Sequence, residues 1–276
     1  MKPYISDPDF TLYVGDSFQL TKTLGSETID AIVTSPPYGD ARGDDYPCAP
    51  PNEYADWIAP LLGELRRVLT PTGSFMLNLG RIFRGGIEHP YLEETLAAAA
   101  SVGWLRIDTL IWHKVNANPS GHPWLTNAHE FVYWFAKTPD AYRGFDADTR
   151  TEYADGSEAR FGRNGHYAAK GARREHTRTP HPDGAKPTSV FQAAVGQNRG
   201  ITHGAPMALP LARQLVCLST PRGGIVLDPF CGSGTTAVAC RERGRRCVGF
   251  EILSDHAEEC AERMGQLSLL AEDTAA

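Results

Sequence analysis

The sequence predicts an α/β fold in which a doubly wound, mostly parallel sheet is covered by helices. Two observations lead to this prediction. Short apolar runs alternate with segments of helical periodicity along most of the 276 residues, as in a sheet layered with helices. One of these runs, at residues 224–228, leads into a glycine-rich turn and then a helical segment, which is the βα unit typical of such sheets.

Apolar runs predict seven strands, at residues 11–14, 29–34, 74–79, 105–112, 131–136, 224–228 and 246–250. Apolar residues at three- and four-residue spacing predict helices at 54–69, 91–102, 207–218 and 234–243, and a last helix from 254. Pro60 is expected to kink the first helix or to split off its first turn. Gly103 and Gly244 are expected to end two of the others. Residues 271–276 are expected to form a frayed tail.

Residues 140–188 interrupt the alternation, because they are rich in Gly, Arg, Asp, His and Pro and show no periodicity. A structureless loop of this length is improbable inside a compact domain. We therefore predict either disorder or a functional insertion between two halves of one domain, residues 1–139 and 189–270.

Charge is distributed unevenly along the chain. The formal net charge of −6 argues against a protein that coats nucleic acid through its overall charge. Residues 159–178, however, hold six basic residues and one acid, Glu175, a net charge of +5, so the remaining residues carry −11. This segment is predicted to contact phosphates through its basic residues, Arg160, Arg163, Lys170, Arg173, Arg174 and Arg178.

Composition excludes other classes of protein. With 41% hydrophobic and 22% charged residues the chain is expected to fold, and it contains no run of 18 apolar residues and no signal-peptide pattern at its N-terminus. We expect a cytoplasmic protein with no membrane partner. The six cysteines form no CxxC pair and no zinc-finger spacing, so we expect neither a metal site nor a disulfide framework.

The glycine-rich turn, DPFCGSGTT at residues 228–236, predicts a nucleotide-type cofactor site. Gly232 and Gly234 let a ligand lie against the backbone and meet the N–H groups that open the next helix. No Gly-Lys-Ser/Thr follows, so this is not a Walker loop. With Ala237 the spacing fits GxGxxG/A, and Glu251 at the end of the next strand can accept ribose hydroxyls. The pattern alone does not separate NAD from S-adenosylmethionine, or either from a turn that serves only compact packing.

A second motif, TSPPY at residues 34–38, follows another predicted strand. The Ser35 hydroxyl and the carbonyls of a rigid Pro-Pro turn offer acceptors beside the aromatic face of Tyr38. An exocyclic amine on a planar base fits this arrangement, with its hydrogens on the acceptors and its ring stacked on the tyrosine. Taken alone, the motif is better explained by a rigid turn in which Tyr38 only packs.

Together the two motifs resemble those of the S-adenosylmethionine-dependent amino-methyltransferases of DNA, which methylate cytosine N4 or adenine N6. The catalytic motif precedes the cofactor loop, with the basic segment between them, an order that resembles the permuted β group of these enzymes. The resemblance covers nearly all of the chain except residues 140–188. It implies a circularly permuted Rossmann-like methyltransferase sheet with a target-recognition insertion at those residues, S-adenosyl-L-methionine as cofactor and double-stranded DNA as substrate.

The resemblance also implies roles for individual residues. The implied catalytic residues are Ser35, Pro36, Pro37 and Tyr38. The implied cofactor-binding residues are Asp16, His203, Asp228, Phe230, Gly232, Ser233, Gly234, Thr235 and Glu251. The hairpin and loop that flank the flipped base add Lys114 and Asn116 to the DNA-binding residues of the basic segment.

Several alternatives stay open. Ser35 favours cytosine N4, because Ser-Pro-Pro-Tyr is similar to the pattern of N4 enzymes, but adenine N6 is an alternative. Methylation at cytosine C5 needs a Cys nucleophile, and the one Pro-Cys pair, at Cys48, lies in a loop away from any predicted strand end. An RNA or protein amino-methyltransferase and a NAD-type binding module or silent DNA reader are more distant alternatives. Whether a cognate restriction endonuclease exists, and whether the protein is a monomer or a homodimer, stay open too.

Overall fold

The computed structural model describes residues 2–39, 47–117, 125–144, 148–153, 164–165, 176–177, 180–195 and 207–275. The chain divides into two units. One consists of Met1–Arg143 and Ser189–Ala276, and the other of Gly144–Thr188. Within the second unit, β9 (Asn164–Gly165) pairs antiparallel with β10 (His176–Thr177), and Thr151 pairs with Ala185.

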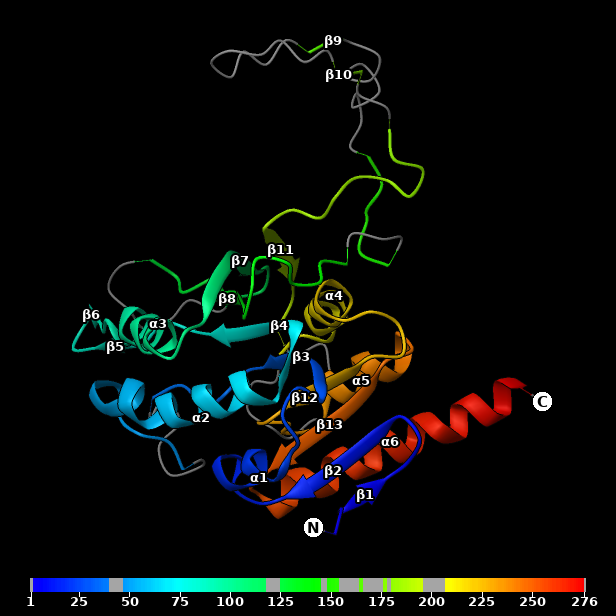
Figure 1. Ribbon diagram of the computed structural model, residues 1–276, viewed down its shortest axis with the longest axis horizontal. Helices are drawn as coiled ribbons and strands as arrows, with labels where there is room; N and C mark the ends of the chain where they lie inside the picture. Colours follow the sequence, from blue (N-terminus) through cyan, green and yellow to red (C-terminus); the bar gives the residue numbers. More distant parts are fainter. Residues whose placement is uncertain are drawn as a thin grey trace. The chain divides into compact units, whose positions relative to one another are not determined.

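The first unit contains a mixed sheet in which the described residues form nine strands, in the order β1-β2-β13-β12-β3-β4-β8-β7-β11 (Figure 1). The strands are β1 (Ile5–Ser6), β2 (Phe10–Val14), β3 (Ile29–Thr34), β4 (Leu69–Leu79), β7 (Leu105–Lys114), β8 (His129–Ala136), β11 (Val190–Ala193), β12 (Ile225–Asp228) and β13 (Arg246–Glu251). The central strands β2, β13, β12, β3 and β4 are parallel, whereas β8 is antiparallel to both β4 and β7. The predicted α/β fold class is confirmed.

All seven predicted strands lie in this sheet, several of them longer than predicted. The additional strands β1 and β11 and the separate hairpin of β5 (Phe83–Arg84) and β6 (Ile87–Glu88) have two to four residues each. Segments this short show no period-2 alternation, so tertiary pairing rather than local sequence defines them.

Helices cover both faces of the sheet. Those of the first unit are α1 (Ser17–Thr23), α2 (Tyr54–Val68), preceded by the 3-10 turn η2 (Pro51–Glu53), α3 (Tyr91–Ser101), α4 (Leu209–Ser219), α5 (Thr235–Glu242) and α6 (Ser254–Ala275). Figure 1 shows α2 and the pair α4 and α5 on opposite sides of the central strands. Leu61 and Leu65 of α2 enter a core with Phe75 and Leu77 of β4, side chains that point to the same face of that strand. This arrangement is doubly wound.

The helices differ from the predicted ones at Pro60 and at the C-terminal tail, and they end at the predicted glycines. The prediction that Pro60 splits off the first turn of α2 is wrong, because the helix continues through it. Six buried residues along α2 outweigh the one missing hydrogen bond, and the proline lies at the cavity described below. Gly103 and Gly244 follow α3 and α5 with φ of +89° and +65°, as helix-ending glycines do. The helix α6 continues through the expected frayed tail to Ala275.

Among the residues that the structure describes, no helix is both long enough and apolar enough to cross a membrane. The six cysteines, all within the described ranges, are free thiols, and five of them are buried.

Candidate active site at the carboxyl edge of the sheet

A cavity of about 640 Å³ opens where the two sequence motifs meet. The strands β12 and β3 are parallel neighbours at the centre of the sheet, and the chain continues from them to opposite sides, through α5 to β13 and through α2 to β4. The loops after β12 and β3 therefore diverge at the same edge, which is where open α/β sheets bind ligands. Both loops line the cavity.

The loop after β12 turns tightly into α5 at Gly234. Gly234 precedes α5 with a φ of +81°, in the left-handed region, and a Cβ there would overlap the sulfur of Cys260. Gly232 also has a positive φ, +51°. Arg263 of α6 holds the loop from outside, since its guanidinium donates to the Ser233 carbonyl at 3.2 Å and to Thr235 Oγ1 at 3.2 Å. The loop is thus a fixed wall of the cavity.

Asp228, at the end of β12, is a buried acid of the cavity and is 4% exposed. Its Oδ1 accepts hydrogen bonds from Thr34 Oγ1 at 2.7 Å and from the Phe230 N–H at 3.1 Å. Burial raises the pKa of Asp228 to about 6, and these hydrogen bonds offset only part of that rise. The bond from Thr34 links Asp228 to the neighbouring strand β3. In its ionised form the carboxylate is a partner for a cationic ligand.

Two further acids of the cavity are Glu251, at the end of β13, and Asp16, directly before α1. Glu251, which ends β13, accepts the N–H of Gly232 on Oε2 and the N–H of Leu253 on Oε1, both at 2.8 Å. Burial raises its pKa as well. Asp16 caps α1 by accepting the Phe18 N–H at 3.0 Å. Both carboxylates line the cavity and keep lone pairs that hydroxyl or amino groups of a ligand can use.

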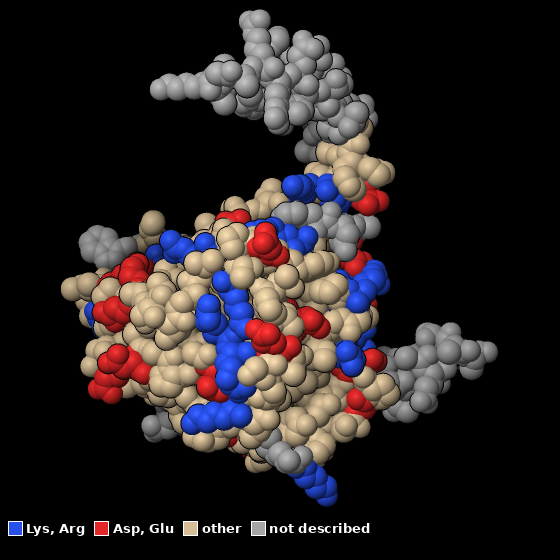
Figure 2. Space-filling model, in the orientation of Figure 1, with Lys and Arg blue, Asp and Glu red and all other residues tan. Residues whose placement is uncertain are grey.

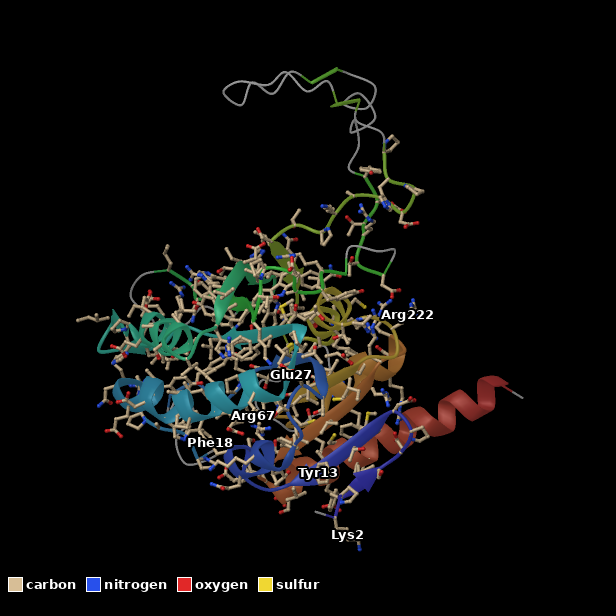
Figure 3. All side chains as sticks on the ribbon, viewed as in Figure 1. Lys2, Tyr13, Phe18, Glu27, Arg67 and Arg222 are labelled. Carbon is tan, nitrogen blue, oxygen red and sulfur yellow. The ribbon has the colours of Figure 1, made fainter. Side chains whose placement is uncertain are left out.

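Aromatic rings form the apolar wall of the cavity. Phe18 of α1 and Trp57 of α2 have ring centroids 5.1 Å apart, and Trp57 and Phe230 lie 6.3 Å apart. Figure 3 labels Phe18 on the side of α1 that faces α2. A planar ring system fits this wall. The sequence did not indicate it, because Trp57 belongs to the ordinary apolar stripe of its helix and α1 was not predicted.

The loop after β3 carries the second motif. Ser35 Oγ lies 2.9 Å from Tyr38 Oη, which donates to Glu130 Oε2 at 2.9 Å. Asn78 Nδ2 lies 2.7 Å from Tyr38 Oη and 2.7 Å from Glu130 Oε2. Lys114 Nζ forms an ion pair with Glu130 Oε1. Burial, and then the nearby Glu130, raise the pKa of Tyr38 well above its usual value, so the phenol stays protonated.

The ring of Tyr38 has room because Gly80, directly after β4, has no side chain. A Cβ on Gly80 would lie 2.8 Å from Tyr38 Cε2. Pro36 and Pro37 line the cavity beside the tyrosine. The turn therefore presents a serine hydroxyl, carbonyl groups and an aromatic ring to the same space as the glycine-rich loop.

Cys48 lies closer to this turn than the sequence suggested. The expectation that it sits away from any strand end is wrong: Cys48 lines the cavity, and its thiol donates to the Pro37 carbonyl at 3.5 Å. Cys48 is packed against the apolar core at this place. Burial raises the pKa of its thiol to about 12, so the group is protonated at neutral pH and is a poor nucleophile.

Most of the site residues predicted from the sequence meet at this cavity. It is lined by Asp16, Ser35, Pro36, Pro37, Tyr38, Asp228, Phe230, Gly232, Ser233, Thr235 and Glu251. Gly234 belongs to the same loop. Seven other predicted positions lie outside the described residues: His203, Arg160, Arg163, Lys170, Arg173, Arg174 and Arg178.

Lys114 and Asn116 were predicted to bind DNA, and both are engaged within the protein. Lys114 pairs with Glu130, and its side chain is 18% exposed. The Asn116 amide donates to the Val195 carbonyl at 2.9 Å and accepts the Val195 N–H at 2.7 Å. Asn116 thus fixes the segment after β11.

Sequence reasoning assigned no role to Asn78 and did not single out Glu130 within its strand. Both are almost completely buried, 1% and 7% exposed. Asn78 interrupts the apolar run FMLNL, and Glu130 directly precedes the apolar run FVYWFA. A buried polar group is costly unless it is hydrogen-bonded, so a polar residue within or next to a buried strand indicates such a partner.

The fold and cavity define a class: a doubly wound α/β protein that places a glycine-rich cofactor loop beside a Ser-Pro-Pro-Tyr turn. Residues 29–262 match the family model N6_N4_Mtase, described as DNA methylase. The chain belongs to this family, and the resemblance drawn from the two motifs is confirmed.

Named relatives agree with the family. The chain is 27% identical to the type II methyltransferase M.ScaI of Streptomyces caespitosus, over 95% of this chain and 84% of that protein. It is 27% identical to M.SmaI of Serratia marcescens, over 92% and 90%. The fold is similar to that of PvuII DNA methyltransferase (cytosine-N4-specific), with a TM-score of 0.74, 21% identity and coverage of 94% and 88%. It is also similar to TTHA0409 of Thermus thermophilus complexed with S-adenosyl-L-methionine, with a TM-score of 0.61, 24% identity and coverage of 92% and 94%.

Proposed function

We propose that this protein is a DNA methyltransferase that transfers the methyl group of S-adenosyl-L-methionine to the exocyclic N4 amine of a flipped cytosine. The observation that carries the proposal is the single cavity that joins the Ser35 turn to the glycine-rich loop. A methyl donor and an amine acceptor have to meet in one space, and this cavity provides both halves.

The residues of the cavity suit S-adenosyl-L-methionine. Ser233 Oγ is buried and has no hydrogen-bond partner among the described residues, so it is a donor for the carboxylate of the methionine part. Asp228 supplies negative charge for the ammonium and sulfonium groups. Glu251 and Asp16 supply acceptors for the ribose hydroxyls and the adenine amine, beside the aromatic wall of Trp57. Bound there, the cofactor supplies an electrophilic methyl group.

On the other side, the Ser35 turn suits a nitrogen nucleophile. The amine of cytosine is a weak nucleophile because its lone pair is delocalised into the ring. Ser35 Oγ and the Pro36 carbonyl accept its two hydrogens, which raises electron density on nitrogen, while stacking on Tyr38 fixes the ring. Binding in the correct orientation contributes much of the remaining acceleration.

Cytosine N4 is favoured over adenine N6 by Ser35. The similarity to a cytosine-N4-specific enzyme in fold supports the same choice. The test is methylation of plasmid and genomic DNA with the purified protein, followed by digestion and mass spectrometry of the nucleosides. We expect N4-methylcytosine, and N6-methyladenine alone would refute the N4 assignment.

Double-stranded DNA is the proposed partner. The face of the first unit shown in Figure 2 carries Lys and Arg interspersed with Asp and Glu. Some of these charges form ion pairs, such as Lys137 with Glu27 and Arg67 with Glu64. The basic segment at 159–178 is the proposed main phosphate contact, because it carries a net charge of +5 in an otherwise acidic chain. The type II relatives support a restriction endonuclease as a functional counterpart.

A further inference from the structure

A network of four side chains is linked to the Ser35 hydroxyl, and the function proposed above does not explain it. Tyr38 follows β3, Asn78 lies on β4, Glu130 on β8 and Lys114 on β7. Three donors converge on the Glu130 carboxylate: Tyr38 Oη, Asn78 Nδ2 and Lys114 Nζ. A carboxylate that is 7% exposed needs such donors, because they offset the cost of its burial.

Counting protons fixes the direction of each hydrogen bond. The Tyr38 hydroxyl has one hydrogen, and it is donated to Glu130 Oε2. Tyr38 Oη can then only accept from its other two neighbours, Asn78 Nδ2 and Ser35 Oγ. The alternative, in which Tyr38 donates to Ser35, would leave two acceptor oxygens, Tyr38 Oη and Glu130 Oε2, 2.9 Å apart with no hydrogen between them. The Ser35 hydrogen is therefore donated to Tyr38 Oη.

This direction determines what Ser35 offers to a substrate. Its only hydrogen is donated to Tyr38, and one of its lone pairs faces Asn78 Nδ2 at 3.3 Å, so Ser35 Oγ can offer a substrate in the cavity a lone pair and no hydrogen. An exocyclic amine brings hydrogens, so the oxygen that meets it has to be an acceptor. If the order were reversed, the serine hydrogen would face the amine hydrogens, and the turn would repel the group that it has to bind.

We propose that Glu130 is a positioning residue for methyl transfer, which acts through Tyr38 to hold Ser35 Oγ as a hydrogen-bond acceptor for the target amine. This inference rests on the proposed function and assigns a new residue to the same site. The raised pKa of Tyr38 supports it, because a phenol that stays protonated always has a hydrogen for Glu130. Asn78 and Lys114 keep the carboxylate in place from its other sides.

The isosteric variant Glu130→Gln tests the proposal. Glutamine keeps the shape but has one acceptor oxygen and one donor nitrogen. If its oxygen faces Tyr38, its nitrogen faces Lys114 Nζ, and if it turns around, its nitrogen faces the donors Tyr38 and Asn78. In either orientation one nitrogen faces another donor, so the wild-type hydrogen bonds from Tyr38, Asn78 and Lys114 to residue 130 cannot all form. We expect kcat for DNA methylation to fall about 10- to 100-fold, while KM for DNA and the calorimetric Kd of S-adenosyl-L-methionine stay within about twofold.

A double-mutant cycle separates positioning from a general structural effect. Tyr38→Phe removes the hydroxyl that links Ser35 to Glu130, so its kcat should fall about as far as that of Glu130→Gln. Adding Glu130→Gln to Tyr38→Phe should cost less than about twofold more, because both changes break one chain of hydrogen bonds. The matched control is Glu27→Gln, another glutamate paired with a lysine, whose side chain is 54% exposed. It should methylate DNA at the wild-type rate.

Three results would overturn the inference, and a fourth would refute the proposed function. Wild-type kcat in Glu130→Gln overturns the inference, and so do losses that multiply in the double variant. If Glu130→Gln does not fold, as judged by thermal denaturation, Tyr38→Phe alone decides, and a full wild-type kcat in that variant overturns the inference. A wild-type protein that methylates no DNA refutes the proposed function instead, and this is measured first.

Discussion

Acidification should weaken cofactor binding through one buried carboxyl group. Burial raises the pKa of Asp228 to about 6, against hydrogen bonds that act in the opposite direction. The group is therefore ionised in the free protein at pH 7.5 and mostly protonated at pH 5. A ligand with sulfonium and ammonium charges binds the ionised form. The apparent Kd then rises by a factor of 1 + 10^(pKa − pH), about twofold at pH 6 and about tenfold at pH 5.

Calorimetric titration of S-adenosyl-L-methionine at pH 7.5, 6 and 5 measures this effect. Glu251 lies in the same cavity and also has a pKa raised by burial, so it contributes to the wild-type curve. The decisive quantity is therefore the difference between the wild type and Asp228→Asn. The variant should bind S-adenosyl-L-methionine at least about tenfold more weakly at pH 7.5, since it loses a charged partner. Its Kd should also lose most of the pH dependence. A flat wild-type Kd between pH 7.5 and 5, or an equal slope in the variant, would refute the reasoning.

Three further outcomes are expected. Gly234→Ala should lower the free energy of unfolding by about 1–3 kcal/mol in thermal denaturation, because its φ is +81° and a Cβ meets Cys260, whereas Gly63→Ala, with open space around it in α2, should not destabilise. An unchanged Tm in Gly234→Ala would contradict the tight loop. Tyr38→Ala should abolish most turnover and leave calorimetric binding of S-adenosyl-L-methionine within about threefold, since stacking on the base is lost; a comparable loss of cofactor affinity would argue against that role. The double variant Arg173→Ala and Arg174→Ala should make the salt dependence of DNA binding shallower, by about one unit of slope for each phosphate that the variant no longer neutralises, and an unchanged slope would exclude these arginines as phosphate ligands.

The sequence predicted the central sheet and two sides of the cavity. Buried parallel strands have apolar runs that local reading detects, and Gly232 and Ser35 follow two such runs directly. The edge at which they meet then follows from the handedness of βα units. The glycine-rich motif also indicated Glu251, and the family resemblance added Asp16. The two acids follow neighbouring parallel strands and line the same cavity.

The features that sequence did not predict depend on tertiary contact. The helix α1 has seven residues, too few for periodicity, and is fixed by the Asp16 cap and by packing of Phe18 on Trp57. Pro60 is tolerated inside α2 because the buried face of that helix holds it in place. Lys114 reads as a surface cation in sequence, yet its partner Glu130 lies on the adjacent antiparallel strand. Which charges pair across strands depends on register, and register is a property of the whole sheet.

The cavity depends on one pair of neighbouring strands rather than on the order of the motifs in the chain. At the start of β3 Asp30 accepts the N–H of Ile225 at 2.8 Å, and at its end Thr34 donates to Asp228 at 2.7 Å. These bonds join β3 and β12 at both ends although 194 residues separate Thr34 from Asp228. Parallel strands that are adjacent bring their following loops together whichever comes first in the sequence. A permuted chain can therefore build the same site, because the site requires that pairing and not a particular connection between the halves.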